Sequence, residues 1–435
     1  MPLGRATRLR YALPTARPLA PRNTQTRGRN LGRVHTLLAA GRSQYAPTSP
    51  LPCPAGGRLR RAPTIARLPW LLLASAGSLG AIGLAAIARS EELTGGGTNF
   101  WRMQLVWWCV AIAAGAALAT TSSQLVGRWS YAAFAGTLVL LVAVYFFPAK
   151  YGAHRWVRFG PVGVQPSELA KIAFVLALAR YLMHRENYRR LRGLLWPLVL
   201  TLVPLVLVLR EPDLGTALVF LPLLLAMLWA AGARLRDLAI VVLVGLLTLP
   251  VLASQMSREQ KSRITALAEQ TGPGQRPTDD GFHLHQSKQV IALGGVWGSA
   301  VTGQWVDDNG VYRLPVAHSD FIFSIVAERF GLAGAGVVLL LFWLLVTASV
   351  RIAGSTNDPF ARLVAAGIAT LFAVEVTINT AMTVGLAPVT GLSLPLLSHG
   401  GSGLVAHVAA LGLLVRVALR DELDVAPAPF RWSPG

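Results

Sequence analysis

Long apolar runs alternate with short polar segments along the chain from residue 68 onward. Each run approaches the ~20 residues that an α-helix needs to cross the hydrocarbon core of a bilayer. The pattern therefore predicts an all-α polytopic membrane protein of about ten helices, and an even number places both termini on one side. The predicted helices cover residues 68–88, 103–121, 129–147, 166–184, 194–210, 213–231, 237–253, 320–349, 361–386 and 400–419.

The composition agrees with a membrane protein. Hydrophobic residues make up 53% of the 435 residues and charged residues only 14%, whereas a soluble domain is about 25% charged. The two cysteines, Cys53 and Cys109, are too few for a disulfide scaffold, and neither has a partner at metal-ligand spacing. Disordered chains, disulfide-stabilised domains and ordinary soluble enzymes are therefore excluded.

Positive charge is concentrated at the N-terminal end of the chain. Residues 1–67 contain 13 arginines and no acidic residue, and they account for most of the net charge of +20. The short loop 185–193 adds four arginines. Because cytoplasmic loops are rich in arginine and lysine, both termini are predicted to be cytoplasmic. We expect a basic, disordered cytoplasmic tail over 1–66, a membrane domain over 67–420 and a short cytoplasmic tail over 421–435.

The basic tail has more than one interpretation. Attraction to anionic lipid headgroups is expected of such a segment. An arginine-rich, acid-free leader is also typical of an organellar transit peptide, and a wrongly assigned start codon would produce the same pattern. Nucleic-acid binding is not expected, because the tail has too few aromatic residues for base stacking.

Four segments are predicted to lie on the outer side of the membrane: 89–102, 148–165, 254–319 and 387–399. The loop 254–319, between the predicted seventh and eighth helices, is far longer than an ordinary connection, and such loops are often functional. Its run SREQKSRITALAEQ has the pattern of a short amphipathic helix at the membrane interface. Residues 388–403 interrupt a helix with proline and glycine; such backbone either lines a cavity or packs inside the protein.

Ionisable side chains within or beside apolar helices are costly, so each is a candidate functional residue. Glu168 and Lys171 lie three residues apart on one helix face, where they can form a structural ion pair or line a site. Arg210, Glu211 and Asp213 form the short turn between the predicted fifth and sixth helices. These three residues either line a site or form a solvated hairpin.

A third group of polar residues lies where the long outer loop meets the predicted eighth helix. Ser319 or Asp320 can cap that helix by accepting backbone N–H hydrogen bonds. Alternatively, Asp320, next to His318 and Ser319, lies at the outer lip of an apolar bundle within reach of a lipid-linked headgroup. Farther along the helix, Glu328 and Arg329 lie on different faces and are predicted to form buried structural pairs.

Five motifs occur in one order: RWVRFGPVGVQPSELAK, EPDLGTALV, GFHLHQSKQVIALGGVWG, LPVAHSDFIFSIVAE and GLAPVTGLSLPLLSHGGSG. Together they resemble the shape, elongation, division and sporulation (SEDS) family, the RodA/FtsW/SpoVE proteins, over residues 68–420. EPDLGTALVF resembles the elongation (RodA) branch more than the division (FtsW) branch. The chain departs from the family pattern at Val316, where Glu is usual, and at His399 and Gly403, where the family has SYGGSS.

The resemblance implies a peptidoglycan glycosyltransferase of ten transmembrane helices in the bacterial cytoplasmic membrane. Such an enzyme polymerises lipid II and works with a class B penicillin-binding protein, which supplies the transpeptidase. The resemblance also implies that Asp320 is the essential acidic residue, and that a divalent cation such as Mg²⁺ or Mn²⁺ assists the reaction. Val316 argues against a two-carboxylate or metal-chelating scheme at this loop, and no residue is assigned as a metal ligand. The implied substrate-binding positions are Arg155, Glu168, Lys171, Arg210, Asp213, Gln286 and Ser287, together with His318 and Ser319 beside Asp320.

The chemistry of glycan polymerisation joins the C4 hydroxyl of an acceptor sugar to C1 of a donor and expels a lipid diphosphate. Asp320 can serve as the general base if it stays ionised, which a helix N-terminus favours. Arg155, Lys171 and Arg210 can neutralise the leaving diphosphate. One base and direct displacement predict inversion at C1.

Two other classes of function are alternatives. A lipid flippase or transporter would line a path through the bilayer with Glu168, Lys171 and Glu375. It would need polar residues along the whole depth, whereas the predicted charges gather at the outer rim. A non-catalytic scaffold for cell-wall proteins would tolerate replacement of Asp320.

Overall fold

A computed structural model of the chain describes most of the predicted membrane domain. The predicted tails over 1–66 and 421–435 lie outside the described residues. So does Val316. The described residues are 68–93, 99–148, 155–159, 162–184, 191–256, 258–269, 280–303 and 317–419.

A helix is present at each of the ten predicted spans, which confirms the all-α class. Seven of the described helices are long and apolar enough to cross a membrane. The other three predicted spans correspond to α5 (Pro166–Met183), α6 (Leu195–Arg210) and α8 (Leu235–Gln255), and α6 is the shortest of them at 16 residues. The count of ten transmembrane helices thus stays a prediction. The helices are α2 (Trp70–Leu93), α3 (Phe100–Thr120), α4 (Ser123–Ala143), α5 (Pro166–Met183), α6 (Leu195–Arg210), α7 (Leu214–Ala231), α8 (Leu235–Gln255), α12 (Ile322–Ser355), α13 (Pro359–Val384) and α14 (Gly401–Leu419).

The long loop between α8 and α12 contains helical structure. The short helix predicted from SREQKSRITALAEQ is present as α9 (Arg258–Glu269). It is followed by α10 (Asp280–Gly294) and the single turn α11 (Ser299–Thr302). The segment before α5 forms a small antiparallel hairpin that the sequence pattern did not predict, with strands β1 (Val157–Phe159) and β2 (Val162–Val164). Short 3₁₀ turns at Val144–Phe146 and Leu191–Leu194 complete the described elements.

Helix ends follow from local sequence. α5 begins at Pro166, whose fixed φ and missing N–H suit the first helical turn. Asp213 caps α7, because its Oδ1 accepts a hydrogen bond from the Thr216 backbone N–H at 3.2 Å. Gly232, with a φ of +96°, ends the same helix in the left-handed conformation that glycine adopts without strain.

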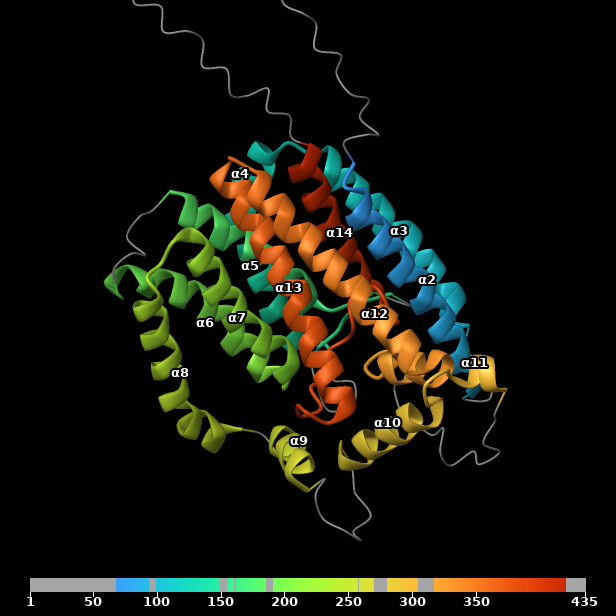
Figure 1. Cartoon of the computed structure of the whole chain (residues 1–435). Helices are drawn as coiled ribbons and strands as arrows, with labels where there is room; N and C mark the ends of the chain where they lie inside the picture. The colour runs from blue at the N-terminus through green and yellow to red at the C-terminus, as the bar shows by residue number, and fades with distance from the viewer. Residues whose placement is uncertain are drawn as a thin grey trace, which may run out of the picture. The chain divides into compact units, whose positions relative to one another are not determined.

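α13 is the central helix of the bundle and packs against α5, α7 and α12 (Figure 1). α14 lies along α3, and α2 lies along α12 (Figure 1). Where α3 and α14 cross, a Cβ atom on Gly412 would lie 2.1 Å from the carbonyl oxygen of Gly115. Small residues of this kind let membrane helices approach closely.

α12 is bent at Gly331, which has a φ of +67° between two helical segments. The turn between α10 and α11 docks at this bend: the Leu332 N–H donates to the carbonyl oxygen of Gly295 at 2.9 Å. A Cβ atom on Gly331 would lie 2.3 Å from the carbonyl oxygen of Val296, so glycine is required here. The predicted continuous helix 320–349 is therefore two segments joined at the point where the long loop packs.

The non-helical backbone between α13 and α14, residues 386–400, is mostly buried. Side chains satisfy its polar groups: Asn379 Nδ2 donates to the carbonyl oxygen of Leu392 at 2.6 Å, and Gln104 Nε2 donates to that of Ser398 at 3.1 Å. The predicted interruption of the helix is confirmed. We refer to residues 386–400 as the re-entrant segment.

One buried ion pair ties α2 to α12. Arg89 Nη2 lies 3.0 Å from Glu328 Oε1, and the two side chains are almost fully buried. This confirms the structural pairing predicted for Glu328. Arg329 is only partly buried, and among the described residues it forms no ion pair, so the same prediction for Arg329 is wrong.

Replacing Gly412 by alanine tests the α3–α14 packing. The added methyl group needs space that the Gly115 carbonyl occupies, so the two helices must separate. We expect the melting temperature of the detergent-purified protein to fall by an amount corresponding to ~1–3 kcal/mol. Gly136→Ala on α4 is the control, because nothing lies within 4 Å of its added Cβ atom. Equal melting temperatures for the two variants would contradict the packing.

Candidate functional site

Asp320 lies just before α12 and is held by its neighbours. Its Oδ1 accepts a hydrogen bond from Ser319 Oγ at 2.9 Å. Its backbone carbonyl accepts one from Asn379 Nδ2 at 3.0 Å, and the same amide group binds the re-entrant segment. The N-cap of α12 is Phe321, and no side chain caps the helix. The interpretation of Ser319 or Asp320 as a helix cap is therefore wrong.

Arg155 and Asp320 approach each other across Gly391 of the re-entrant segment. Gly391 has a φ of +71°, and a Cβ atom there would lie 3.5 Å from Asp320 Oδ2 and 3.9 Å from Arg155 Nη1. Arg155 Nε donates to the carbonyl oxygen of Glu211 at 3.0 Å, and its Nη2 donates to that of Pro212. One guanidinium group thus binds the α6–α7 turn and lies near the Asp320 carboxylate.

The electrostatics of Asp320 differ from the sequence expectation. Burial raises the pKa of its carboxyl group above the ordinary value, despite the opposing effects of the Ser319 hydrogen bond, Arg155 and Arg263. Arg263 comes from α9 and donates to the carbonyl oxygen of Thr390 at 3.3 Å. Ionisation was expected to be favoured by a helix N-terminus, but loss of hydration is the larger effect. A carboxylate with a raised pKa is a stronger base, provided that it is ionised.

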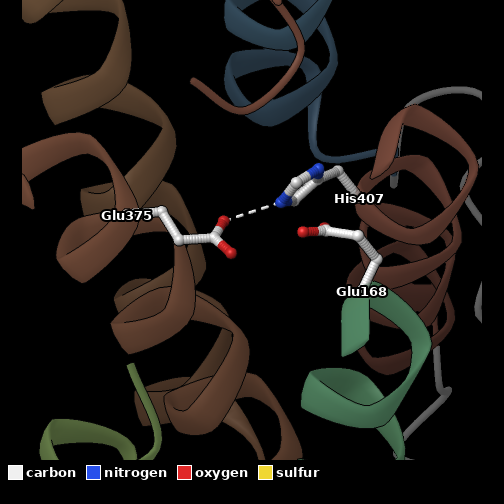
Figure 2. A group of neighbouring side chains, drawn as sticks. All are labelled: Glu168, Glu375 and His407. Carbon is white, nitrogen blue, oxygen red and sulfur yellow. Dashed lines mark hydrogen bonds and ion pairs between the residues drawn. The ribbon is translucent and has the colours of Figure 1, made fainter. Parts of the chain in front are cut away.

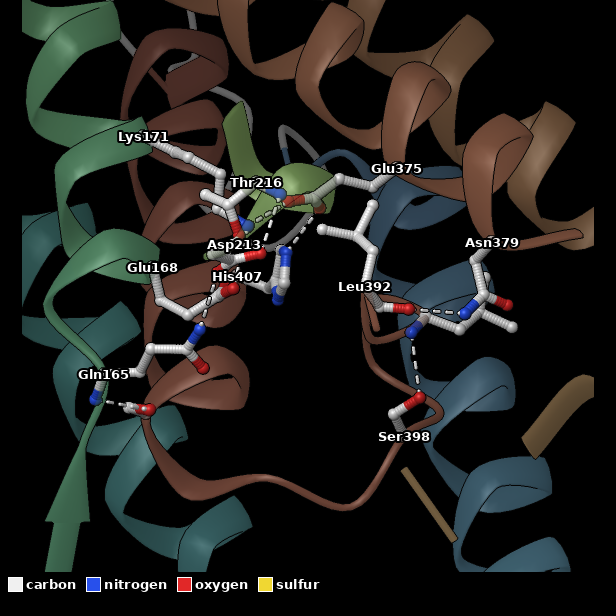
Figure 3. A network of polar contacts seen from close by, with 12 residues as sticks. Gln165, Glu168, Lys171, Asp213, Thr216, Glu375, Asn379, Leu392, Ser398 and His407 are labelled. Carbon is white, nitrogen blue, oxygen red and sulfur yellow. Dashed lines mark hydrogen bonds and ion pairs between the residues drawn. The ribbon is translucent and has the colours of Figure 1, made fainter. Parts of the chain in front are cut away.

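The α6–α7 turn places two carboxylates close to Arg155. Asp213 accepts hydrogen bonds from the Thr216 hydroxyl at 2.9 Å and from Gln165 Nε2 at 3.3 Å (Figure 3). Glu211 is fully buried, and neither of its carboxylate oxygens has a hydrogen-bond partner among the described residues. Burial, followed by repulsion from Asp213, raises the pKa of Glu211 to about 8, and Arg155 only partly offsets the rise. A solvated hairpin is therefore excluded for Glu211 and Asp213.

The predicted pair of Glu168 and Lys171 is confirmed, but it belongs to a larger network. Lys171 Nζ lies 2.9 Å from Glu168 Oε1 and also donates to Glu375 Oε1. His407 Nε2 lies 2.6 Å from the second oxygen of Glu375 (Figure 2). The sequence analysis grouped Glu375 on α13 with Glu168 and Lys171 only in the transporter alternative, and it did not predict the contact with His407 on α14. We call these four residues the charge network.

The charge network also bears on the predicted divalent cation. Glu168, Glu375 and His407 offer three ligand atoms within 4.8 Å of one another. However, Lys171 already donates hydrogen bonds to both carboxylates. An ammonium group satisfies this donor set, which therefore does not fit a resident Mg²⁺ or Mn²⁺. We assign no step to a metal ion, and the predicted cation requirement stays a prediction.

The other predicted site residues are more dispersed. Arg210 is exposed at the end of α6. Ser287 is buried and bonds to the Ser324 hydroxyl and the Thr383 carbonyl, so it joins α10 to α12 and α13. Gln286 beside it is also buried. His318 stacks on Phe100, with ring centroids 4.3 Å apart.

Comparison with protein families and curated relatives gives concordant matches. Residues 66–422 match the family model described as cell cycle protein, which covers FtsW, RodA and SpoVE. A probable peptidoglycan glycosyltransferase FtsW of Trichlorobacter lovleyi is 34% identical over 339 residues, which is 76% of this chain and 86% of the relative. The protein of the same name from Mycobacterium tuberculosis is 34% identical over 367 residues, covering 82% of this chain and 68% of the relative.

Solved structures share the fold. A chain from a peptidoglycan synthase complex that coordinates polymerization and crosslinking has a TM-score of 0.69 and 28% identity, covering 80% of this chain and 97% of that one. The rod shape determining protein RodA of Thermus thermophilus has a TM-score of 0.60 and 28% identity, covering 82% and 98%.

Glu211 predicts a pH dependence of stability. Its carboxyl pKa is about 8 in the folded protein against an ordinary value of 4.5. Between these values the folded state holds a proton that the unfolded state has lost, so this contribution is complete below 4.5 and disappears as the pH rises through 8. Melting temperatures measured between about pH 6 and pH 9 should fall more steeply for the wild type than for Glu211→Gln. Glu92→Gln, at the exposed end of α2, controls for loss of a carboxylate; parallel curves for wild type and Glu211→Gln would contradict the assignment.

Proposed function

This chain belongs to the FtsW/RodA/SpoVE family of cell cycle proteins, and we propose that it polymerises lipid II into glycan strands. It is a multi-pass protein of the bacterial inner membrane and a peptidoglycan glycosyltransferase of the SEDS type. The observation that carries the proposed reaction is the meeting of one carboxylate, Asp320, with one guanidinium group, Arg155, across Gly391. A base and a cation in one place are what glycosyl transfer from a diphosphate requires.

In the proposed reaction, the Asp320 carboxylate takes the proton of the acceptor C4 hydroxyl. The oxygen then attacks C1 of the donor sugar, and the bond from C1 to the diphosphate oxygen breaks with inversion at C1. Asn379 and Ser319 hold Asp320 in place through its backbone and its side chain. Their hydrogen bonds reduce the freedom of the base before substrate binds.

Arg155 is the best-placed cation for the leaving diphosphate, with Arg263 as the second. Both act electrostatically on Asp320. A guanidinium group suits a diphosphate because it can form two parallel hydrogen bonds. Lys171 was expected to share this role, but it is buried and already donates to two carboxylates. Arg210 is exposed at the end of α6, so its proposed contact with diphosphate requires substrate to reach that surface.

The cellular role and the partner form a further part of the proposal. The sequence favoured cell elongation, whereas the curated relatives carry the name FtsW, which favours division. We propose a class B penicillin-binding protein as the partner, in line with the similarity to a chain of a peptidoglycan synthase complex. Cytoplasmic termini, with polymerisation at the outer face, complete the proposed arrangement.

Asp320→Asn tests the proposed base. Asparagine preserves the shape of the side chain and can still accept from Ser319, so folding should be unaffected. The rate of lipid II polymerisation by the purified protein, with and without a cognate transpeptidase, should fall by ~10²-fold or more. Asp358→Asn, at the cap of α13, is the control and should polymerise normally.

Three outcomes separate the proposed function from its alternatives. Near-normal polymerisation by Asp320→Asn would remove Asp320 from the mechanism. A wild-type protein that moves lipid II between leaflets but never polymerises it would be a flippase. A wild-type protein that does neither, and supports growth after Asp320 is replaced, would be a scaffold.

Gly391→Ala tests the geometry across which Asp320 and Arg155 meet. The new methyl group would stand 3.5 Å from Asp320 Oδ2, on a residue whose φ of +71° disfavours alanine. We expect polymerisation to fall by about tenfold or more, because the base is displaced. Gly400→Ala in the same segment, with open space around its added Cβ atom, should keep its activity. Equal activity of the two variants would rule out this geometry.

A further inference from the structure

The charge network is buried more completely than the site around Asp320. The proposed reaction gives no role to two of its members, Glu375 and His407. None of its four side chains is more than 5% exposed. They come from three helices: Glu168 and Lys171 from α5, Glu375 from α13, and His407 from α14 (Figure 3). The network therefore ties the central helix of the bundle to two of its neighbours.

The charges of this network do not balance unless the histidine contributes. Two carboxylates and one ammonium group leave one negative charge without a partner. An unpaired buried charge is strongly destabilising. The hydrogen bond of 2.6 Å between His407 Nε2 and Glu375 requires an N–H on Nε2, because a carboxylate only accepts. A second proton on the imidazole ring would make the network neutral.

The contacts within the network also leave one atom free. Both oxygens of Glu375 are engaged, one by Lys171 and the other by His407. Glu168 Oε1 is engaged by Lys171, but Glu168 Oε2 is buried and has no hydrogen-bond partner among the described residues. A Cβ atom on Gly403 would lie 3.5 Å from this oxygen and 3.8 Å from Ser393 Oγ, so the oxygen lies where α14 meets the re-entrant segment.

We propose that His407 is a positively charged imidazolium and that the His407–Glu375 pair is a positioning pair for Lys171 and Glu168. By binding the second oxygen of Glu375, His407 lets Lys171 bridge the two carboxylates. Lys171 in turn holds Glu168 with Oε2 directed toward the re-entrant segment, whose Gly391 lies beside Asp320. This oxygen is then an acceptor for a hydroxyl or amide N–H group of the glycan substrate. The inference rests on the proposed polymerase function and adds two residues that do not touch the reacting atoms.

If charge balance holds the network together, polymerisation rates of the single and double variants of His407 and Glu375 should follow the net charge that each variant leaves. His407→Gln keeps an N–H donor for Glu375 but leaves the network with one excess negative charge. Lipid II polymerisation should fall by about tenfold or more, in line with the cost of a buried uncompensated charge. Glu375→Gln removes one negative charge, and loss of one proton from His407 then restores a neutral network. Its effect on polymerisation should therefore be smaller than that of His407→Gln. The double variant should return to within about threefold of Glu375→Gln alone, because Glu168 and Lys171 then balance each other.

His285→Gln is the control for the loss of one histidine, because His285 is exposed on α10. It should polymerise normally. Melting temperatures of all variants are measured in parallel, and the rescue must appear in the rate rather than in the fraction of folded protein. A double variant as inactive as His407→Gln, or a His407→Gln variant within about twofold of wild type, would overturn the proposal.

A spectroscopic measurement tests the charge of His407 without relying on activity. In protein labelled with ¹⁵N-histidine, one of the eight histidines should show the nitrogen shifts of an imidazolium at neutral pH. That signal should vanish in His407→Gln and change to a neutral form in Glu375→Gln. A neutral imidazole at residue 407 in the wild type would overturn the proposal. If the imidazolium is found but wild-type protein never polymerises lipid II, the proposed function fails and the charge assignment stands.

Discussion

The structure depends on the requirement that charges buried in an apolar bundle be balanced where they lie. Lys171 meets this requirement by bonding to two carboxylates from different helices, Glu168 and Glu375. The pairing fixes α5 against α13, and the hydrogen bond of Glu375 to His407 adds α14. Because hydrophobic burial does not drive one helix against another within lipid, polar bonds and close packing decide which helices meet. The close approach of Gly115 and Gly412 supplies the packing part.

The re-entrant segment is possible because its backbone groups have partners. Asn379 binds both the carbonyl of Leu392 and that of Asp320, so one amide group holds the segment and the candidate base together. Gln104 binds the Ser398 carbonyl and the Gly400 N–H near the start of α14. Backbone without helical hydrogen bonds is stable at membrane depth only under such conditions. The Asn379 bonds also hold Asp320, the proposed base, so one side chain serves both the stability of the segment and the proposed function.

The site contains two carboxyl groups, those of Asp320 and Glu211, and the surroundings of each raise its pKa. Burial raises the pKa of Asp320 and that of Glu211, although Arg155 acts on both in the opposite direction. Arg155 donates to the backbone of the turn that carries Glu211 and lies beside Asp320 across Gly391. A single guanidinium group thus acts on both carboxyl groups, and it is also the cation that we propose for the leaving diphosphate.

The sequence by itself determined the helical membrane class, the position of each long helix, the interruption over 388–403 and the pairing of Glu168 with Lys171, because these depend on local composition and spacing. Ordered motifs also pointed to the family and to Asp320. The sequence did not place Glu375 and His407 with Lys171, nor Glu211 in a buried site, because these contacts join residues far apart in the chain. It also favoured an ionised Asp320, since a helix start is visible in a sequence and burial is not. Only the tertiary structure decided which charges share one low-dielectric interior, and that choice fixes both their partners and their protonation.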